Sequence, residues 1–210
     1  MRTDVLVINV NLNPATTEGC EAIQARLQML RPELSVAVMH WTDASLEKEA
    51  ENARGLVLGP NENPFPSYPD SFRGLLDWVR VQGGPILGVC GGHQVLALAH
   101  GAHVAPVHDV PPATTSYAGM PKMDGLTPTR RVREDPLCAD LPERFEVSSS
   151  HVDEVKSLPE GFRLILEGAP SVIQMMRMEG RPVWGVQFHP EHDRAGDAGR
   201  GLLERWLDLL

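Results

Sequence analysis

Three residues of this chain have the types and spacing needed for nucleophilic catalysis: Cys90, His189 and Glu191. A cysteine acts as a nucleophile in its thiolate form. A histidine can take up the thiol proton near neutral pH and later return a proton to a leaving group. Eight histidines are present, and His189 has the best context because it ends an apolar run and precedes Pro190. Glu191 follows two residues later and is placed to fix the tautomer of the ring, so the pattern predicts a nucleophile–base–acid triad.

The residues around the cysteine predict a sharp turn. The segment 85–89 is apolar and indicates a buried strand, whereas 94–100 has the composition of a helix. Gly88 and Gly92 flank Cys90 at two residues on either side, where larger side chains would collide in a tight bend. The spacing is that of a nucleophile elbow, which exposes the thiol at the edge of a sheet.

The first half of the chain alternates strand and helix patterns. Expected strands are 4–10, 34–39, 55–58 and 85–89, and expected helices are 16–30, 46–53, 69–81 and 94–100. This order predicts an α/β fold with a doubly wound, mainly parallel sheet flanked by helices. Sites in such sheets lie outside the carboxyl ends of the strands, which here points to the turn at Cys90 and to the loop after 55–58.

The second half changes character and predicts a small antiparallel β extension. Short strands are expected at 129–132, 145–148, 162–166, 172–176 and 183–188, the last two forming a hairpin around Glu179-Gly180. A C-terminal helix is expected over 199–210, with its apolar side chains on one stripe. The length of 210 residues fits one domain spanning 1–210.

Composition restricts the class of function. The net charge of −9 and the lack of a basic block argue against nucleic-acid binding. No apolar run is long enough to span a membrane and no signal peptide is evident, so a cytoplasmic location is expected. Cys20 and Cys138 are expected to be small buried side chains without disulfides. His100 and His103 have a spacing that metal sites use but lack a third ligand, so neither a metal nor another cofactor is predicted.

The motif Gly88-x-Cys-x-Gly-x-Gln94, together with 187–191, resembles the class I (triad) glutamine amidotransferase family, which has a flavodoxin-like fold. The segments 150–155 and 158–162 are similar to the glutaminase part of GMP synthetase in particular. The resemblance implies that Cys90 attacks the side-chain amide of glutamine and carries a γ-glutamyl thioester. It further implies that His189 is general base and then general acid, that Glu191 orients it, and that ammonia and glutamate are released. Gln94 and the main chain at Ser150 and His151 would hold the amino-acid head of the substrate.

A tetrahedral intermediate also needs an oxyanion hole. The N–H of Gly91 is the expected first donor, and the second should come from the loop after 55–58. That loop reads Gly59-Pro60-Asn61, where the family usually has a glycine pair or Pro-Gly. Pro60 has no N–H, so Asn61 and Gly59 are both candidates. Asn61 is acceptable even if the position requires positive φ.

Two further departures leave the acceptor of the ammonia open: residues 108–125 match no family loop, and 192–196 lacks a Thr or Ser found in many synthetase-associated members. The main hypothesis is a glutaminase that passes ammonia to a separate synthase subunit, since no phosphate-binding P-loop motif is present and the length leaves no room for an acceptor-activating domain. The second is a γ-glutamyl hydrolase acting on a small γ-glutamyl amide or peptide. The third is a non-catalytic regulatory module, against which the intact triad argues.

Overall fold

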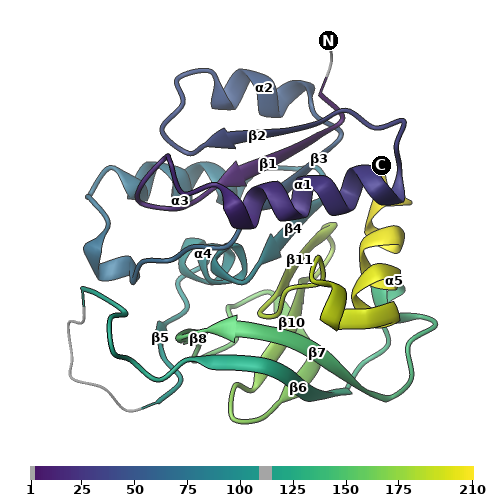
Figure 1. The fold of residues 1–210 in the computed structure, drawn as a ribbon. Coiled ribbons are helices and arrows are strands. Elements are labelled where there is room, and N and C mark those ends of the chain that lie inside the picture. The colour runs from purple at the N-terminus through teal and green to yellow at the C-terminus, as the bar shows by residue number, and fades with distance from the viewer. Residues whose placement is uncertain (1–2, 109–114) are drawn as a thin grey trace.

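The computed structural model describes residues 3–108 and 115–210, and Figure 1 shows their arrangement. The α-helices are α1 (Glu18–Leu30), α2 (Leu46–Asn52), α3 (Phe72–Val81), α4 (Gly91–Ala99) and α5 (Gly196–Leu207). Short 3-10 helices are η1 (Phe65–Ser67), η2 (Pro136–Cys138) and η3 (Asp193–Ala195). The strands are β1 (Val5–Asn9), β2 (Val36–His40), β3 (Gly55–Leu58), β4 (Ile86–Val89), β5 (Val104–Pro106), β6 (Met123–Arg131), β7 (Arg144–His151), β8 (Asp153–Val155), β9 (Phe162–Gly168), β10 (Ile173–Met178) and β11 (Val183–Val186).

One nine-stranded sheet runs through the molecule in the order β2-β1-β3-β4-β11-β10-β9-β6-β7. The neighbours from β2 to β11 are parallel, so their carboxyl ends meet at one edge. In the register of this edge Leu58 lies beside Gly88, and Val89 lies beside Val186. The loops after β3, β4 and β11 therefore converge, although β11 lies almost one hundred residues after β4 in the chain.

The remaining strands of the large sheet pair antiparallel, from β11 through β10, β9 and β6 to β7. The β6–β7 pair is the longest, and it curves below the carboxyl edge of the parallel half (Figure 1). A separate small sheet pairs β5 with β8. Within the large sheet the antiparallel part thus has as many strand pairings as the parallel part. The expected strands 129–132 and 145–148 belong to longer ones: the first lies at the end of β6 and the second in the first part of β7.

Helices cover both faces of the parallel half, as the continuous apolar strands require. Alternate residues of β1 point to opposite faces: Val5 and Val7 pack with the side chains of α1 and α5, and Leu6 and Ile8 pack with those of α2, α3 and α4. Two apolar cores result, one on each side of the sheet. The expected α/β fold with its parallel sheet and antiparallel extension is confirmed. Within the described residues, no helix is long and apolar enough to cross a membrane.

The turn between β4 and α4 is packed so closely that only glycine fits at its two flanking positions. A Cβ atom on Gly92 would collide with the carbonyl oxygen of Leu58, and one on Gly88 would lie 2.5 Å from the carbonyl oxygen of Gly92. Helix α4 therefore starts directly under the end of β3. It begins at Gly91, three residues before the expected start at Gln94.

Replacing Gly92 with alanine should lower the free energy of unfolding, because the new methyl group meets the main chain of β3, which cannot move aside as a flexible side chain can. A loss of about 1–3 kcal/mol is expected, measured by urea denaturation. Gly74→Ala is the matched control, since nothing lies within 4 Å of its Cβ position in α3. That change should raise stability by about 0.5–1 kcal/mol through the better helix propensity of alanine. Equal effects of the two substitutions would contradict this account of the turn.

Candidate active site

Cys90 occupies the strained turn between β4 and α4. Its φ is 50° and its ψ is −102°, and within the described residues it is the only non-glycine residue with positive φ. Such a conformation persists only where the surroundings enforce it. Here the Cys90 N–H donates to the carbonyl oxygen of Val186 at 2.8 Å, which ties the turn to the end of β11. The side chain is 4% exposed.

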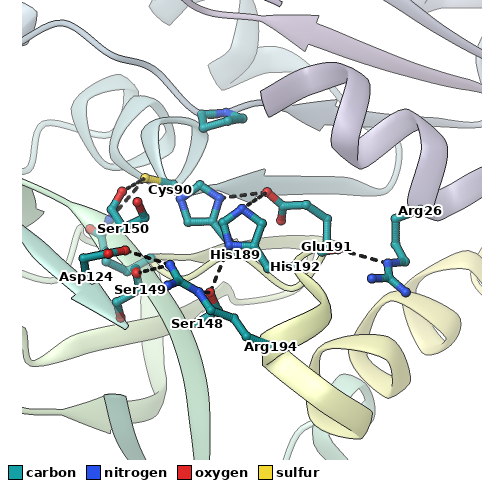
Figure 2. A network of polar contacts seen from close by, with 12 residues as sticks. Arg26, Cys90, Asp124, Ser148, Ser149, Ser150, His189, Glu191, His192 and Arg194 are labelled. Carbon is teal, nitrogen blue, oxygen red and sulfur yellow. Dashed lines mark hydrogen bonds and ion pairs between the residues drawn. The ribbon is translucent and has the colours of Figure 1, made fainter. Parts of the chain in front are cut away.

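His189 and Glu191 lie beside the thiol, on the loop that follows β11 (Figure 2). Glu191 Oε1 accepts a hydrogen bond from His189 Nδ1 at 2.7 Å, and both side chains are buried. The bond places the proton on Nδ1 of a neutral His189 ring and leaves Nε2 free for the reacting thiol. The loop is anchored by the His189 N–H, which donates to Ser148 O, and by Arg26 Nε, which donates to Glu191 O. The structure therefore brings the three residues of the predicted triad together.

The electrostatics of this group favour a protonated histidine. Burial by itself lowers the pKa of His189, but the negative charge of Cys90 and the contact with Glu191 outweigh burial and raise the pKa to about 10. An imidazolium next to a thiolate is the ion pair that a cysteine nucleophile needs. The two other cysteines differ: burial raises the pKa of both Cys20 and Cys138 to about 12, so neither is an alternative nucleophile.

The loop after β3 faces the start of α4. A Cβ atom on Gly91 would lie 2.5 Å from Asn61 N, so the main chains of these two residues are in direct contact. Within the described residues neither N–H donates a hydrogen bond, and both are near the thiol. Gly59, the other candidate, is already used: its N–H donates to Ile8 O at 2.9 Å as part of the sheet. The expectation for Gly59 is therefore corrected, whereas Asn61 fits without positive φ.

A buried asparagine holds this loop in place. Asn11, just after β1, accepts a hydrogen bond from Glu62 N at 2.9 Å and donates to Pro60 O at 3.4 Å. Its side chain also donates to Asn9 Oδ1, and its carbonyl oxygen accepts from Trp41 Nε1. Sequence reasoning placed Asn11 in a loop and missed this function. The signal was the polar pair Asn9 and Asn11 at the carboxyl end of an otherwise apolar strand.

Two neighbouring cavities open at the site. One of about 140 Å³ contains the thiol and is lined by Asn11, Gly19, Pro60, Asn61, Glu62, Cys90, Lys122, Ser150, His189 and His192. The other, of about 280 Å³, is lined by Asn61, Glu62, Tyr117, Met120, Lys122, Ser150, His151 and Val152. They share four residues and together form a depression that ends at Cys90. A further cavity of about 440 Å³ lies at the opposite end of the β6–β7 pair and has no lining residue in common with them.

The three expected substrate residues are placed differently. Ser150 lines both cavities, and its carbonyl oxygen lies 3.9 Å from Cys90 Sγ. His151 lines the larger cavity, and burial lowers its pKa to about 4, so it is neutral. Gln94 lines neither cavity. Its Nε2 donates to Asp153 O at 2.7 Å and to Gln187 Oε1 at 3.3 Å, so Gln94 supports the chain after β7, and direct contact with substrate stays a prediction.

Among the residues of the cavity wall that sequence reasoning missed are Glu62, Tyr117 and Lys122. The Tyr117 hydroxyl donates to Asp153 Oδ2 at 2.6 Å, which fixes the segment before β6 against β8. Lys122 and Glu62 face the cavities, and within the described residues neither side-chain charge has an ion-pair partner. No motif could have found Tyr117 and Lys122, because residues 108–125 have no recognisable family pattern. Residues 109–114 of this segment lie outside the described residues.

One group in the described residues has the spacing of a metal site: His189, Glu191 and His192, with one ligand atom of each within 4.8 Å of the others. His189 Nδ1 and Glu191 Oε1 already bond each other. The arrangement therefore suits proton transfer between Cys90 and His189 better than binding of a cation.

The raised pKa of His189 should depend on both of its partners. Burial lowers the pKa of His189, and Cys90 and Glu191 both raise it. Cys90→Ala and Glu191→Gln each remove one of these two partners, so the pKa of His189 should fall. Because the pKa of His189 is higher in the folded protein than in the unfolded chain, its protonation stabilises the fold. This stabilisation is complete below the pKa of the unfolded chain, about 6.5, and is lost as the pH rises to about 10. The free energy of unfolding should therefore drop more between these pH values in the wild type than in Cys90→Ala. NMR titration of the ring and pH-dependent urea denaturation measure the two effects. An unchanged pKa in both variants would contradict the ion pair.

Known proteins resemble this chain over most of its length. Residues 20–208 match the family described as glutamine amidotransferase class-I. A protein of Methanosarcina barkeri, named as a subunit of glutamine-hydrolyzing GMP synthase, is 35% identical over 162 residues, covering 76% of this chain and 75% of that protein. The Methanocaldococcus jannaschii protein of the same name is 37% identical over 107 residues, about half of each chain. A crystal structure from Thermoplasma acidophilum, described as that of a GMP synthase subunit, superposes with a TM-score of 0.75 at 21% identity, covering 100% of this chain and 95% of that one.

The match to the family covers nearly all of the chain, and the fold agrees with it. The alignment to the Methanosarcina barkeri relative spans three quarters of both proteins at an identity above 30%. The chain belongs to the class I glutamine amidotransferase family.

Proposed function

We propose that this chain is a glutaminase subunit in which Cys90, His189 and Glu191 form the catalytic triad. The single observation that carries the proposal is the contact of these three side chains beside a cavity at the carboxyl edge of the sheet. In the first step the Cys90 thiolate attacks the side-chain amide carbon of glutamine. The N–H groups of Gly91 and Asn61 stabilise the oxyanion.

The proton balance follows from the ion pair. The His189 imidazolium gives its Nε2 proton to the leaving nitrogen, so ammonia departs and a γ-glutamyl thioester remains on Cys90. His189, now neutral, then takes a proton from water, which attacks the thioester. Collapse of the resulting adduct releases glutamate, whose new carboxyl group gives its proton to solvent, and restores the Cys90 thiolate beside the His189 imidazolium. Glu191 stays ionised throughout and holds the ring in the orientation that both steps need.

The amino-acid head of glutamine carries one positive and one negative charge, and the cavity wall carries two unpaired charges of opposite sign. Lys122 is suited to the α-carboxylate and Glu62 to the α-ammonium group, with Ser150 and His151 between them. The cavity at the thiol, about 140 Å³, would take the side-chain amide. Glutamine rather than a bulkier γ-glutamyl compound is therefore the substrate we favour.

The ammonia would serve a separate synthase subunit. Supporting this are the relatives named as subunits of GMP synthase, since that designation implies at least one further polypeptide. We infer that this chain supplies the amino group of GMP in the same way. Addition of the synthase partner together with its nucleotide substrates should accelerate glutamine hydrolysis, and equal rates with and without them would argue for a free-standing hydrolase.

Cys90→Ala should abolish glutamate release, because no other group in the cavity can form a thioester. The fold should be retained, since the substitution removes one sulfur atom from a cavity wall. Glutamate formation and circular dichroism report the two properties. Cys138→Ala serves as the matched control at a buried cysteine outside the site. Residual hydrolysis at the wild-type rate in Cys90→Ala would refute the proposed nucleophile.

Lys122→Met should raise KM for glutamine by roughly tenfold while kcat changes little, because the lost ion pair holds the part of the substrate that does not react. Initial rates over a range of glutamine concentrations measure both constants. Lys156→Met is the matched control, since Lys156 pairs with Glu154 and lines neither cavity. A fall in kcat with an unchanged KM would show that Lys122 has another role.

An ammonia- and amine-release assay on glutamine, γ-glutamyl amines and γ-glutamyl peptides separates the two enzymatic hypotheses. The glutaminase account predicts that glutamine has the highest kcat/KM of the series. A preference for γ-glutamyl amines or peptides would favour the γ-glutamyl hydrolase instead.

A further inference from the structure

A second histidine lies directly against the triad. The rings of His189 and His192 are stacked, with centroids 4.5 Å apart and planes 5° from parallel (Figure 2). His192 belongs to the segment that departs from the family pattern, and its side chain is 34% exposed at the wall of the smaller cavity. One face of the His189 ring is thus covered by another aromatic ring.

The hydrogen bonds of His192 define which of its nitrogens carries the proton. Ser148 Oγ lies 2.9 Å from His192 Nδ1 and accepts a hydrogen bond from Arg194 Nε at 2.6 Å. Ser148 is fully buried, so its hydroxyl hydrogen needs an acceptor among these partners. Arginine has only donors, and His192 Nδ1 is therefore that acceptor. It follows that His192 is neutral and carries its proton on Nε2.

Arg194 is itself held in place. Its Nη2 donates to Asp124 Oδ1 at 2.8 Å and to Ser149 O at 2.9 Å, so it connects β6, β7 and η3 (Figure 2). The serine hydroxyl therefore has a fixed donor behind it and turns its own hydrogen toward His192. The stacked ring is built into the β6–β7 pair rather than free at the surface.

Some charges around His192 raise its pKa and others lower it. Its own loop contributes Glu191, whose Oε1 lies 3.8 Å from His192 Nε2, and the stacked His189. Arg194 of η3 and Asp124 of β6 face it from the other side, and Glu62, Lys122 and Cys90 share its cavity. Burial is the largest effect and lowers the pKa of His192, with His189 and Arg194 adding to the decrease and Glu191 and Asp124 opposing it.

We propose that His192 is a positioning residue for His189: Ser148 and Arg194 hold it as a neutral flat ring, and its stacking fixes the plane in which His189 Nε2 faces Cys90. The inference rests on the proposed function, because it assigns His189 the role of proton carrier. Apart from its contact with Cys90, the ring is held by the hydrogen bond to Glu191 Oε1, whereas the bonds to Ser148 O and from His192 N hold only the main chain of His189. A neutral neighbour also leaves the positive charge of the pair on His189 alone.

The test compares His192→Ala with His192→Phe, which restores a flat ring but no nitrogen. We expect kcat for glutamine to fall roughly tenfold in His192→Ala with KM nearly unchanged, and to return to within about threefold of the wild type in His192→Phe. The rate of Cys90 alkylation by iodoacetamide, located by mass spectrometry, should follow the same order. His103→Ala is the matched control, because His103 is exposed and its side chain makes no hydrogen bond within the described residues.

Other roles of His192 would give different results in these experiments. A raised KM with unchanged kcat would make His192 a substrate contact, and an equal loss in His192→Phe and His192→Ala would rule out stacking; either overturns the proposal. Wild-type values of kcat and alkylation in both variants would overturn it as well. If the wild type releases no glutamate, the proposed function fails, but alkylation of Cys90 still tests the positioning of His189 independently.

The assigned tautomer has a separate readout. Nitrogen NMR of the wild type should show His192 protonated at Nε2 and not at Nδ1. In Ser148→Ala the donor to Nδ1 is gone, so the pKa of His192 should rise. Ser149→Ala is the matched control, because the Ser149 hydroxyl bonds Thr127 rather than His192. A proton on Nδ1 in the wild type, or a pKa unchanged by Ser148→Ala, would contradict the arrangement.

Discussion

The parallel pairing of β4 with β11 is the constraint on which the site depends. Cys90 follows one of these strands and His189 follows the other, and the hydrogen bond from Cys90 N to Val186 O fixes the two ends against each other. A shift of register by one residue would turn every side chain of β11 to the opposite face. The close contact of Gly92 with the end of β3 adds the third strand to this arrangement, so the Cys90 thiol, His189 and the loop at Asn61 are positioned by one sheet edge.

The antiparallel strands provide the other walls of the site formed at the edge of the parallel half. β7 provides Ser150, which faces the thiol, and Ser148, which bonds both the main chain of His189 and the ring of His192. Asp153 of β8 receives the Tyr117 hydroxyl and so holds the cavity wall before β6. The parallel half thus supplies the reactive groups, and the extension supplies the walls and the supports that keep these groups in one geometry.

Local patterns were sufficient to predict that Cys90, His189 and Glu191 come together and that a strand-to-helix turn lies at Cys90. The glycines around Cys90 and the sequence His189-Pro-Glu191 each specify a short piece of backbone, and the alternation of strands and helices brings both to the same edge. The approach of Gly91 to Asn61 could be predicted for the same reason, while their function as oxyanion donors stays a prediction. Gly59 was wrong because a single sequence does not reveal that its N–H is used by the sheet.

The hydrogen bonds that hold the site residues in place could not be predicted, because they join segments that are distant in the chain. The contact of Ser148 with His192 depends on the register of β7 and on the path of the chain into η3, and neither has a sequence signal. For Asn11 the sequence shows only a polar residue just after an apolar strand, and it does not show that this side chain reaches from the end of β1 to the loop after β3. The length of β6 was underestimated because Gly125 and Pro128 interrupt its pattern, and that of β7 because its second half, 148–151, is polar; the pairing of the two strands compensates for these residues.

The central claim is that a γ-glutamyl group is carried on Cys90, and the most direct test is to isolate it. The protein is mixed with glutamine, quenched in acid after a fraction of a turnover, digested and examined by mass spectrometry, with His189→Asn included to slow hydrolysis of the thioester. The account predicts a γ-glutamyl group on the peptide that contains Cys90 and none on those that contain Cys20 or Cys138. Glutamate accumulation without any label on Cys90, or a label on another residue, would contradict it.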